Sequence, residues 1–283
     1  MLTRFAPSPT GDLHLGHAYS AVLAHAAARG AGGQFLIRID DIDGSRSREE
    51  YVAASLADLA WLGLDWDGDP LRQSARLGDY AAALDMLRAR GLVYPCFCTR
   101  ADIAASVAAP HGPSGAVYPG TCRHLPEAER ESRMAGEPHC WRLDMARAAA
   151  RAGDLAWEEA GQGLRAADPL AHGDIVLARK DAPASYHLAS ALDDAMMGVT
   201  HVIRGADLIA STDVHRLLQA LLDLPTPVYR HHPLVCGPDG QRLAKRDAAA
   251  SLASLRAAGT DGPALATDLL GQRLPTGYSL RMP

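Results

Sequence analysis

Apolar and polar positions follow two different periods along the first ninety residues. Short apolar runs are followed by longer segments in which apolar side chains recur at helical spacing. Strands are predicted over residues 2–6 and 34–40, and helices from about residue 14, over 47–62 and over 79–90. Strands that alternate with helices at this pace predict an α/β fold with a doubly wound parallel sheet.

The amino-acid composition of the chain changes in its middle third. Residues 95–174 contain cysteines, glycines, prolines and scattered charge, which is typical of an insert rich in loops. The alternating pattern then returns, so we expect one sheet domain in two halves, 1–94 and 175–224. Residues 225–283 hold a short apolar piece, a glycine-proline turn and a final helical region.

Composition narrows the class of protein. With 283 residues and 48% hydrophobic content, the chain can form one large domain or one domain with an insert. Its apolar runs are too short to span a bilayer and it begins with no signal-like segment, so a cytoplasmic protein without membrane contact is expected. The net charge of -5 argues against a protein that coats nucleic acid. Any RNA contact should be local, at residues 123–133 and 230–246.

The strongest local motif is RFAPSPTGDLHLGH, residues 4–17. A predicted strand leads through a tight loop into a helix start, where free backbone N–H groups and the helix dipole favour phosphate. His14 and His17 could lie against a triphosphate there. Taken alone, H-x-G-H is about as often a solvated helix start with incidental histidines.

The whole block resembles the amino-terminal signature of the glutamyl- and glutaminyl-type class I aminoacyl-tRNA synthetases. The resemblance implies that His14, Gly16 and His17 hold ATP. It further implies that Arg4 meets the side-chain carboxylate of glutamate and that Ala6, Pro7 and Ser8 line the amino-acid pocket.

Two later segments continue the resemblance. GGQFLIRIDDID, residues 32–43, is similar to the family's G-G-x-F-x-x-R-I-E-D-x-D, with Asp40 where the family usually has the glutamate that binds the substrate ammonium group. The segment that contains Tyr186 and Arg204 matches the family's later glutamate-binding region. Without the family, the acidic cluster would be a strand cap and Arg204 a surface residue.

RLAKR, residues 242–246, resembles the synthetase lysine loop, with arginine for the first lysine and alanine for serine. The resemblance implies that Lys245 contacts ATP. Because the α-carboxylate of glutamate is already ionised, its attack on ATP needs alignment and charge neutralisation more than a base. His14, His17, Lys245 and Mg²⁺ are expected to supply these catalytic functions.

The odd count of five cysteines suits metal ligands or plain thiols better than a disulfide framework. Cys96, Cys98, Tyr118 and Cys122 could gather on one metal, and sulfur ligands in tetrahedral number favour Zn²⁺. His111 or His124 could replace Tyr118 as the fourth ligand. Buried reduced cysteines are the default interpretation of such residues, and Cys140 and Cys236 look structural.

The arrangement Cys, Cys, Tyr, Cys resembles the zinc site of the glutamyl-queuosine branch of the family. Few residues follow the lysine loop, so no anticodon-binding domain is expected. This branch implies transfer of glutamate to queuosine in tRNA(Asp). The alternatives are a truncated glutamyl-tRNA synthetase that charges tRNA(Glu) and a non-catalytic, zinc-stabilised RNA-binding adaptor.

Overall fold

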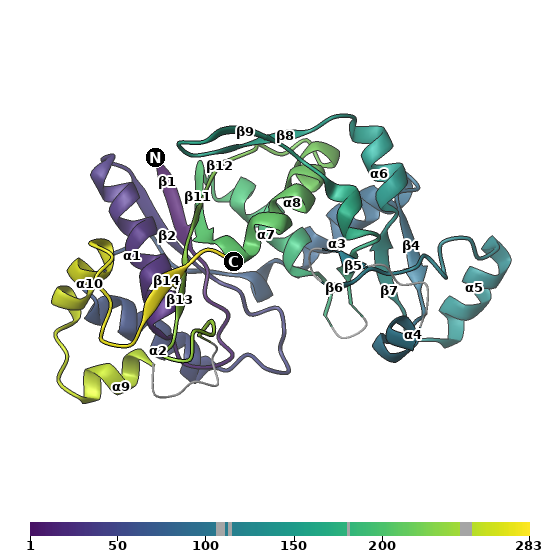
Figure 1. Ribbon diagram of the computed structural model, residues 1–283. Coiled ribbons are helices and arrows are strands. Elements are labelled where there is room, and N and C mark those ends of the chain that lie inside the picture. Colours follow the sequence, from purple (N-terminus) through teal and green to yellow (C-terminus); the bar gives the residue numbers. More distant parts are fainter. Residues whose placement is uncertain (106–110, 113–114, 180–181, 244–250) are drawn as a thin grey trace.

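The central sheet is parallel and carries helices on both faces (Figure 1). The computed structural model describes residues 1–105, 111–112, 115–179, 182–243 and 251–283. On one side of the sheet the order is β1-β2-β3, and on the other side β11 pairs with β12, in each case in parallel. These strands are β1 (Leu2–Phe5), β2 (Gln34–Ile39), β3 (Leu71–Arg72), β11 (His201–Gly205) and β12 (Val228–His232).

The two halves of the sheet meet at β1 and β11. The backbone N–H of Thr200 donates to the carbonyl of Leu2 over 3.0 Å, which places the start of β11 beside the start of β1. From this pair the strands follow one another outwards, β1-β2-β3 in one direction and β11-β12 in the other. The predicted doubly wound α/β fold is confirmed.

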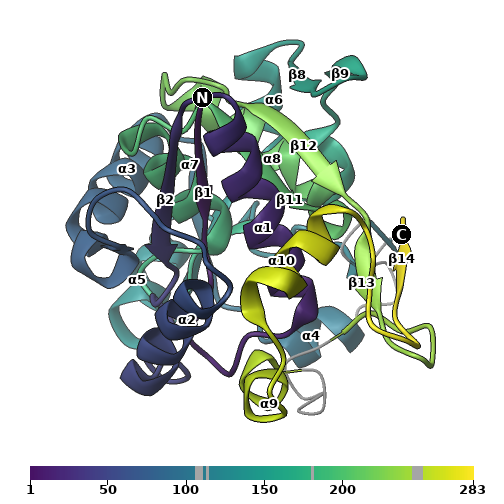
Figure 2. The ribbon, with the colours of Figure 1, turned by 90° about the vertical axis from the view of Figure 1, so that its left-hand side faces the viewer.

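Helices lie on both faces of the sheet (Figure 2), and two large hydrophobic clusters pack around them. α1 (Leu15–Gly30) packs with α2 (Glu49–Trp61) and the carboxyl-terminal α10 (Gly262–Leu270) over one face. α3 (Leu77–Ala89), α7 (Tyr186–Met196) and α8 (Ile209–Leu221) cover the other. Small alanine side chains on the buried side of α1 let its backbone lie close to β1 and β2.

A separate antiparallel sheet, ordered β10-β7-β4, lies beside the second core. Its strands are β4 (Val93–Cys96), β7 (Cys140–Leu143) and β10 (Val176–Ala178), and the elements around it are α4 (Arg100–Ala105), β5 (His111–Gly112), β6 (Gly115–Ala116), α5 (Glu127–Gly136) and α6 (Met145–Ala152). This sheet extends a few residues beyond both limits of the expected 95–174 insert. The hairpin of β8 (Ala156–Glu159) and β9 (Gly163–Ala166), although within those limits, joins the central sheet through β12.

The last segment folds back over α1. β13 (Leu234–Cys236) pairs with β14 (Ser279–Arg281), and α9 (Leu252–Ala257) leads into α10. Side-chain oxygens of Ser251 and Asp261 accept from backbone N–H groups in the first turns of α9 and α10, as N-cap residues do. Within the described ranges, no helix has the length and apolar character needed to cross a bilayer.

Candidate active site

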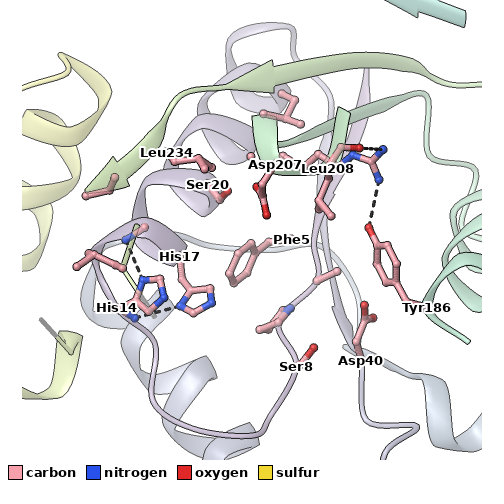
Figure 3. A pocket seen from close by; sticks show the side chains of 18 of the residues that line it. Phe5, Ser8, His14, His17, Ser20, Asp40, Tyr186, Asp207, Leu208 and Leu234 are labelled. Atoms are coloured by element: carbon pink, nitrogen blue, oxygen red, sulfur yellow. Dashed lines mark hydrogen bonds between the residues drawn. The ribbon is translucent and has the colours of Figure 1, made fainter. Parts of the chain in front are cut away.

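A pocket opens at the carboxyl ends of β1 and β11 (Figure 3). Its volume of about 520 Å³ is in the range of small-molecule sites. The switch point of a doubly wound sheet is where ligands bind in such folds. It is lined by all the predicted glutamate and ATP residues that the structure describes: Arg4, Ala6, Pro7, Ser8, His14, Gly16, His17, Asp40, Tyr186 and Arg204.

Two neighbouring histidines, the N-cap residue His14 and His17, lie at the amino-terminal end of α1. Nδ1 of His14 accepts from the backbone N–H of Gly16 over 3.1 Å, and Nδ1 of His17 accepts from that of His14 over 3.2 Å. The ring centroids are 3.8 Å apart. A Cβ on Gly16 would lie 3.0 Å from the His14 ring, so glycine is what allows this packing. With Nδ1 as acceptor, the proton of each neutral ring sits on Nε2, which makes that nitrogen a donor.

On one side of the pocket, two arginines share a buried carboxylate. Arg4 donates to Asp194 through Nε over 2.8 Å and through Nη2 over 3.2 Å. Nη1 of Arg38 donates to the same carboxylate over 2.7 Å. All three residues are at least 95% buried. We call this side, with Asp40, the acidic side.

Asp40 belongs to the same network. Arg38 grips it with Nε at 2.6 Å and Nη2 at 3.2 Å, a two-bond fork that fixes the carboxylate. Burial raises the pKa of Asp40, and the charge of Arg38 only partly offsets this. For Asp194 the balance is reversed: burial acts to raise its pKa, but Arg4 and Arg38 outweigh burial and lower it.

The neighbouring carboxylate, Asp193, points the other way from the same turn of α7. It accepts from Gln73 over 2.7 Å, from Arg76 over 2.8 Å and from the Tyr80 hydroxyl over 2.9 Å. Two consecutive buried aspartates thus tie α7 to the first half of the chain. Asp194 reaches the pocket-lining arginines and Asp193 anchors the segment between β3 and α3.

In the same pocket, Arg204 on β11 has only neutral hydrogen-bond partners among the described residues. It donates to hydroxyls, to a carbonyl and to imidazoles, and no carboxylate in the described part of the chain forms an ion pair with it. The partners are Tyr186 at 3.2 Å, Leu208 O at 3.1 Å, Thr212 at 2.7 Å, His215 at 3.3 Å and His231 at 3.3 Å. Only 5% of Arg204 is exposed. We call this the imidazole side.

The imidazoles beside Arg204 are held neutral. Burial, followed by the charge of Arg204, lowers the pKa of His231 to about 4 and that of His215 well below its usual value. Glu159 accepts from the backbone N–H of His231 over 2.8 Å and lies 2.6 Å from its Nδ1. A proton on Nδ1 leaves Nε2 as the acceptor that faces Nε of Arg204. Within the described residues, the guanidinium therefore has no charged hydrogen-bond partner.

The mouth of the pocket is bridged by an ion pair. Arg242, the first residue of the predicted lysine loop, contacts Asp207 over 2.7 Å. Leu243 lines the pocket, and just beyond the loop the N–H of Leu252 donates to the carbonyl of Leu13 over 2.8 Å. Lys245 itself lies outside the described residues.

A second cluster lies at the edge of the antiparallel sheet. The sulfur atoms of Cys96, Cys98 and Cys122 are all within 4.8 Å of one another. The Tyr118 hydroxyl is 3.6 Å from the sulfur of Cys98 and accepts from the backbone N–H of Cys122 over 2.7 Å. Three thiols and a phenol at one point are a donor set that fits a tetrahedral soft-metal site.

The alternative fourth ligands differ in position. His124 is exposed and does not join the three cysteines, while the side chain of His111 lies outside the described part of the chain. Cys140 faces Cys96 across the β4–β7 pair, next to the cluster. Cys236 is buried in β13, away from it.

The sequence interpretation missed the residues that hold the predicted ones in place. Arg38, Asp194, Thr212, His231 and Glu159 all contact a predicted glutamate residue, directly or through one neighbour. For Arg38 a signal existed: a charge inside the apolar strand FLIRI must be buried and therefore paired. Glu159 and Asp194 show no comparable local pattern.

Comparison with known proteins places the chain in a class. Residues 1–274 match the family of class I tRNA synthetases (E and Q), catalytic domain. The chain belongs to this family, and ATP is a substrate that fits such a synthetase.

Within the family, the chain is similar to proteins named glutamyl-Q tRNA(Asp) synthetase. It is 49% identical to the one from Rhodobacter capsulatus over 283 residues, 96% of this chain and all of the relative. It is 47% identical to the one from Symbiobacterium thermophilum over 91% of this chain and 81% of that relative. A crystal structure of glutamate-tRNA synthetase from Elizabethkingia anophelis superposes with a TM-score of 0.73 at 28% identity. That alignment covers 87% of this chain and 53% of the synthetase, so the chain spans about half of the longer enzyme's length.

Proposed function

We propose that this protein activates L-glutamate with ATP to glutamyl-adenylate and transfers the glutamate to the queuosine base in the anticodon of tRNA(Asp). The observation that carries the choice of amino acid is Arg204. A buried guanidinium whose described partners are all neutral attracts an anion, and its planar fork suits a carboxylate. The relatives named glutamyl-Q tRNA(Asp) synthetase support the choice of acceptor.

Each side of the pocket has its own task in this proposal. Arg204, with the Tyr186 hydroxyl beside it, binds the side-chain carboxylate of glutamate, and Arg4 adds positive charge from β1. Asp40, which lines the pocket near Tyr186 (Figure 3) and is held by Arg38, binds the substrate ammonium group. Ala6, Pro7 and Ser8 form the wall between them.

ATP occupies the end of the pocket at α1. Nε2 of His14 and His17 donates to phosphate oxygens, and the absence of a side chain at Gly16 lets the nucleotide approach the backbone. Lys245, with Mg²⁺, neutralises the charge that develops on the leaving pyrophosphate. The α-carboxylate of glutamate is the nucleophile, so the pocket needs no base for this step.

Zn²⁺ is proposed for the second cluster, held by Cys96, Cys98, Cys122 and Tyr118. The metal would stabilise the loops of the insert, 95–174, that surround the cluster. In this proposal the insert lies between the two catalytic halves, 1–94 and 175–224, and residues 225–283 form the lysine-loop region. It takes no part in bond making.

The decisive experiment compares acceptors. We expect glutamate transfer to tRNA(Asp) that carries queuosine, and none to tRNA(Asp) without it or to tRNA(Glu). Queuosine-containing tRNA(Asp) that lacks its terminal adenosine should still be charged, because the ester forms in the anticodon. Charging of tRNA(Glu) at its terminal adenosine would instead identify a glutamyl-tRNA synthetase activity. A protein that binds RNA but shows no glutamate-dependent exchange between ATP and pyrophosphate would be an adaptor.

A further inference from the structure

Arg142 is a second buried arginine that has no carboxylate partner in the described part of the chain. It lies on β7 and only 8% of it is exposed. Nη1 donates to the carbonyl oxygen of Asp174 over 2.6 Å, and within the described residues Nε has no hydrogen-bond partner. Arg142 forms no ion pair with any other described residue. Because an unpaired buried guanidinium is costly, the structure should supply an anion close by.

The groups around Arg142 are those of the cysteine cluster. Its guanidinium carbon lies 4.0 Å from the centre of the Tyr118 ring. Its partner across the β4–β7 pair is Tyr94, two residues before Cys96 on the same strand. Arg142 therefore contacts one of the four groups proposed to bind zinc and lies on the strand that faces a second.

A zinc centre of this composition carries a net negative charge. Three thiolates and one Zn²⁺ sum to -1 when the phenol is neutral, and to -2 when it is ionised. Such a charge in a buried site is unfavourable unless a cation lies beside it. The uncompensated charges on Arg142 and on the metal centre are thus opposite in sign and adjacent.

We propose that Arg142 is the counter-ion of the zinc–thiolate centre and positions Tyr118 as its fourth ligand. The proposal rests on the zinc site described above. Arg142 binds no metal itself; it lowers the free energy of the metal-bound state by charge, and its stack on the phenol ring fixes the direction of the hydroxyl.

A matched control is Arg88 on α3, which contacts the strand that contains Arg142. Arg88 stacks on Trp141, the residue next to Arg142, with its guanidinium carbon 4.1 Å from the ring centre. Unlike Arg142, it is 43% exposed and paired with Asp85 at 2.7 Å. Arg88→Met therefore removes an arginine–aromatic stack from the same sheet without removing a charge from the cysteine cluster.

The test measures zinc affinity by competition with a chromophoric chelator on the purified full chain. We expect Arg142→Met to weaken zinc binding by about tenfold to a hundredfold, Arg142→Lys to recover part of the loss, and Arg88→Met to match the native protein. With Co²⁺ in place of zinc, the thiolate-to-metal charge-transfer bands should shift in Arg142→Met but not in Arg88→Met.

Two failures can be told apart. A native protein that retains no stoichiometric zinc overturns the zinc site itself. If the native protein binds one zinc per chain and Arg142→Met binds it with unchanged affinity and unchanged cobalt bands, the counter-ion role is wrong while the zinc site stands. Should Arg142→Met not fold, the Arg142→Lys variant tests the role of the positive charge. Zinc affinity close to that of the native protein supports the counter-ion role. Zinc affinity as low as that of a protein whose cysteine cluster is unfolded contradicts it.

Discussion

The acidic and imidazole sides of the pocket use the same residue type in opposite ways. Arg4 and Arg204 are buried to nearly the same extent, 4% and 5% exposed, and line the same pocket. Arg4 is bonded to Asp194 through two nitrogens, whereas every described partner of Arg204 is neutral. Burial and position alone would assign both the same role.

The difference separates holding the fold from binding a ligand. On the acidic side, positive and negative charges already balance, so Arg4 and Arg38 join β1 and β2 to α7 whether or not glutamate is present. On the imidazole side, hydroxyls and neutral rings orient Arg204 without cancelling its charge. A substrate carboxylate gains most from the second arrangement.

Arg204→Gln should have the largest effect, because it removes the charge that the imidazole side leaves uncompensated. We expect glutamate-dependent exchange between ATP and pyrophosphate to fall about a thousandfold, equivalent to about 4 kcal/mol. Thermal stability without ligand should stay the same or rise. Arg230→Gln, an exposed arginine on the adjacent strand, is the matched control and should leave exchange unchanged. Native exchange in Arg204→Gln would remove Arg204 from the glutamate site.

Arg4→Gln should act mainly on stability. It leaves Asp194 with one cation instead of two, at an expected cost of about 3 kcal/mol in urea unfolding. Adding Asp194→Asn to Arg4→Gln should recover part of the loss, since the buried charge disappears. If the double variant is as unstable as the sum of the two single variants, the two side chains do not interact as their 2.8 Å contact indicates.

The neutral state of His231 predicts a pH dependence of stability. Its folded-state pKa is lowered to about 4, so the unfolded chain takes up the proton first as pH falls from about 6.5. Stability from this group is complete above that range and is lost towards pH 4, by about 2–3 kcal/mol. The groups that face the ring are Glu159, Arg204 and Thr212. His231→Asn should flatten this part of the urea-stability curve, and a curve parallel to the native one would contradict the assignment.

Asp40→Glu tests the acidic side with the smallest change. It restores the residue of the family pattern but inserts a methylene into a carboxylate that Arg38 already grips at 2.6 Å. We expect glutamate activation to fall by about tenfold, at the low end of what one methylene costs in a fitted pocket. An increase in activation would show that Asp40 lies short of the ammonium group.

The sequence predicts the sheet, the helices and the lining of the pocket because each depends on local signals. The H-x-G-H turn, the strand just before Asp40 and the apolar strand that contains Arg204 are all contiguous patterns. What separates Arg4 from Arg204 is not local. Asp194 is 190 residues from Arg4, and Glu159 reaches His231 from a hairpin that the sequence assigns to the insert. Pairings over such sequence distances depend on the topology of the fold, and a local sequence motif contains no information about that topology.

The order in which the ribosome makes the chain gives the acidic side a consequence for folding. Arg4 and Arg38 emerge within the first forty residues, but the carboxylate they share comes more than 150 residues later. At ordinary rates of synthesis that interval lasts about ten seconds or longer. Until α7 arrives, closing the β1–β2 unit would bury Arg4 without Asp194. We therefore expect the nascent amino-terminal half to remain accessible to chaperones and proteases. The β1–β2 unit should become compact only after residue 194 has left the ribosomal exit tunnel.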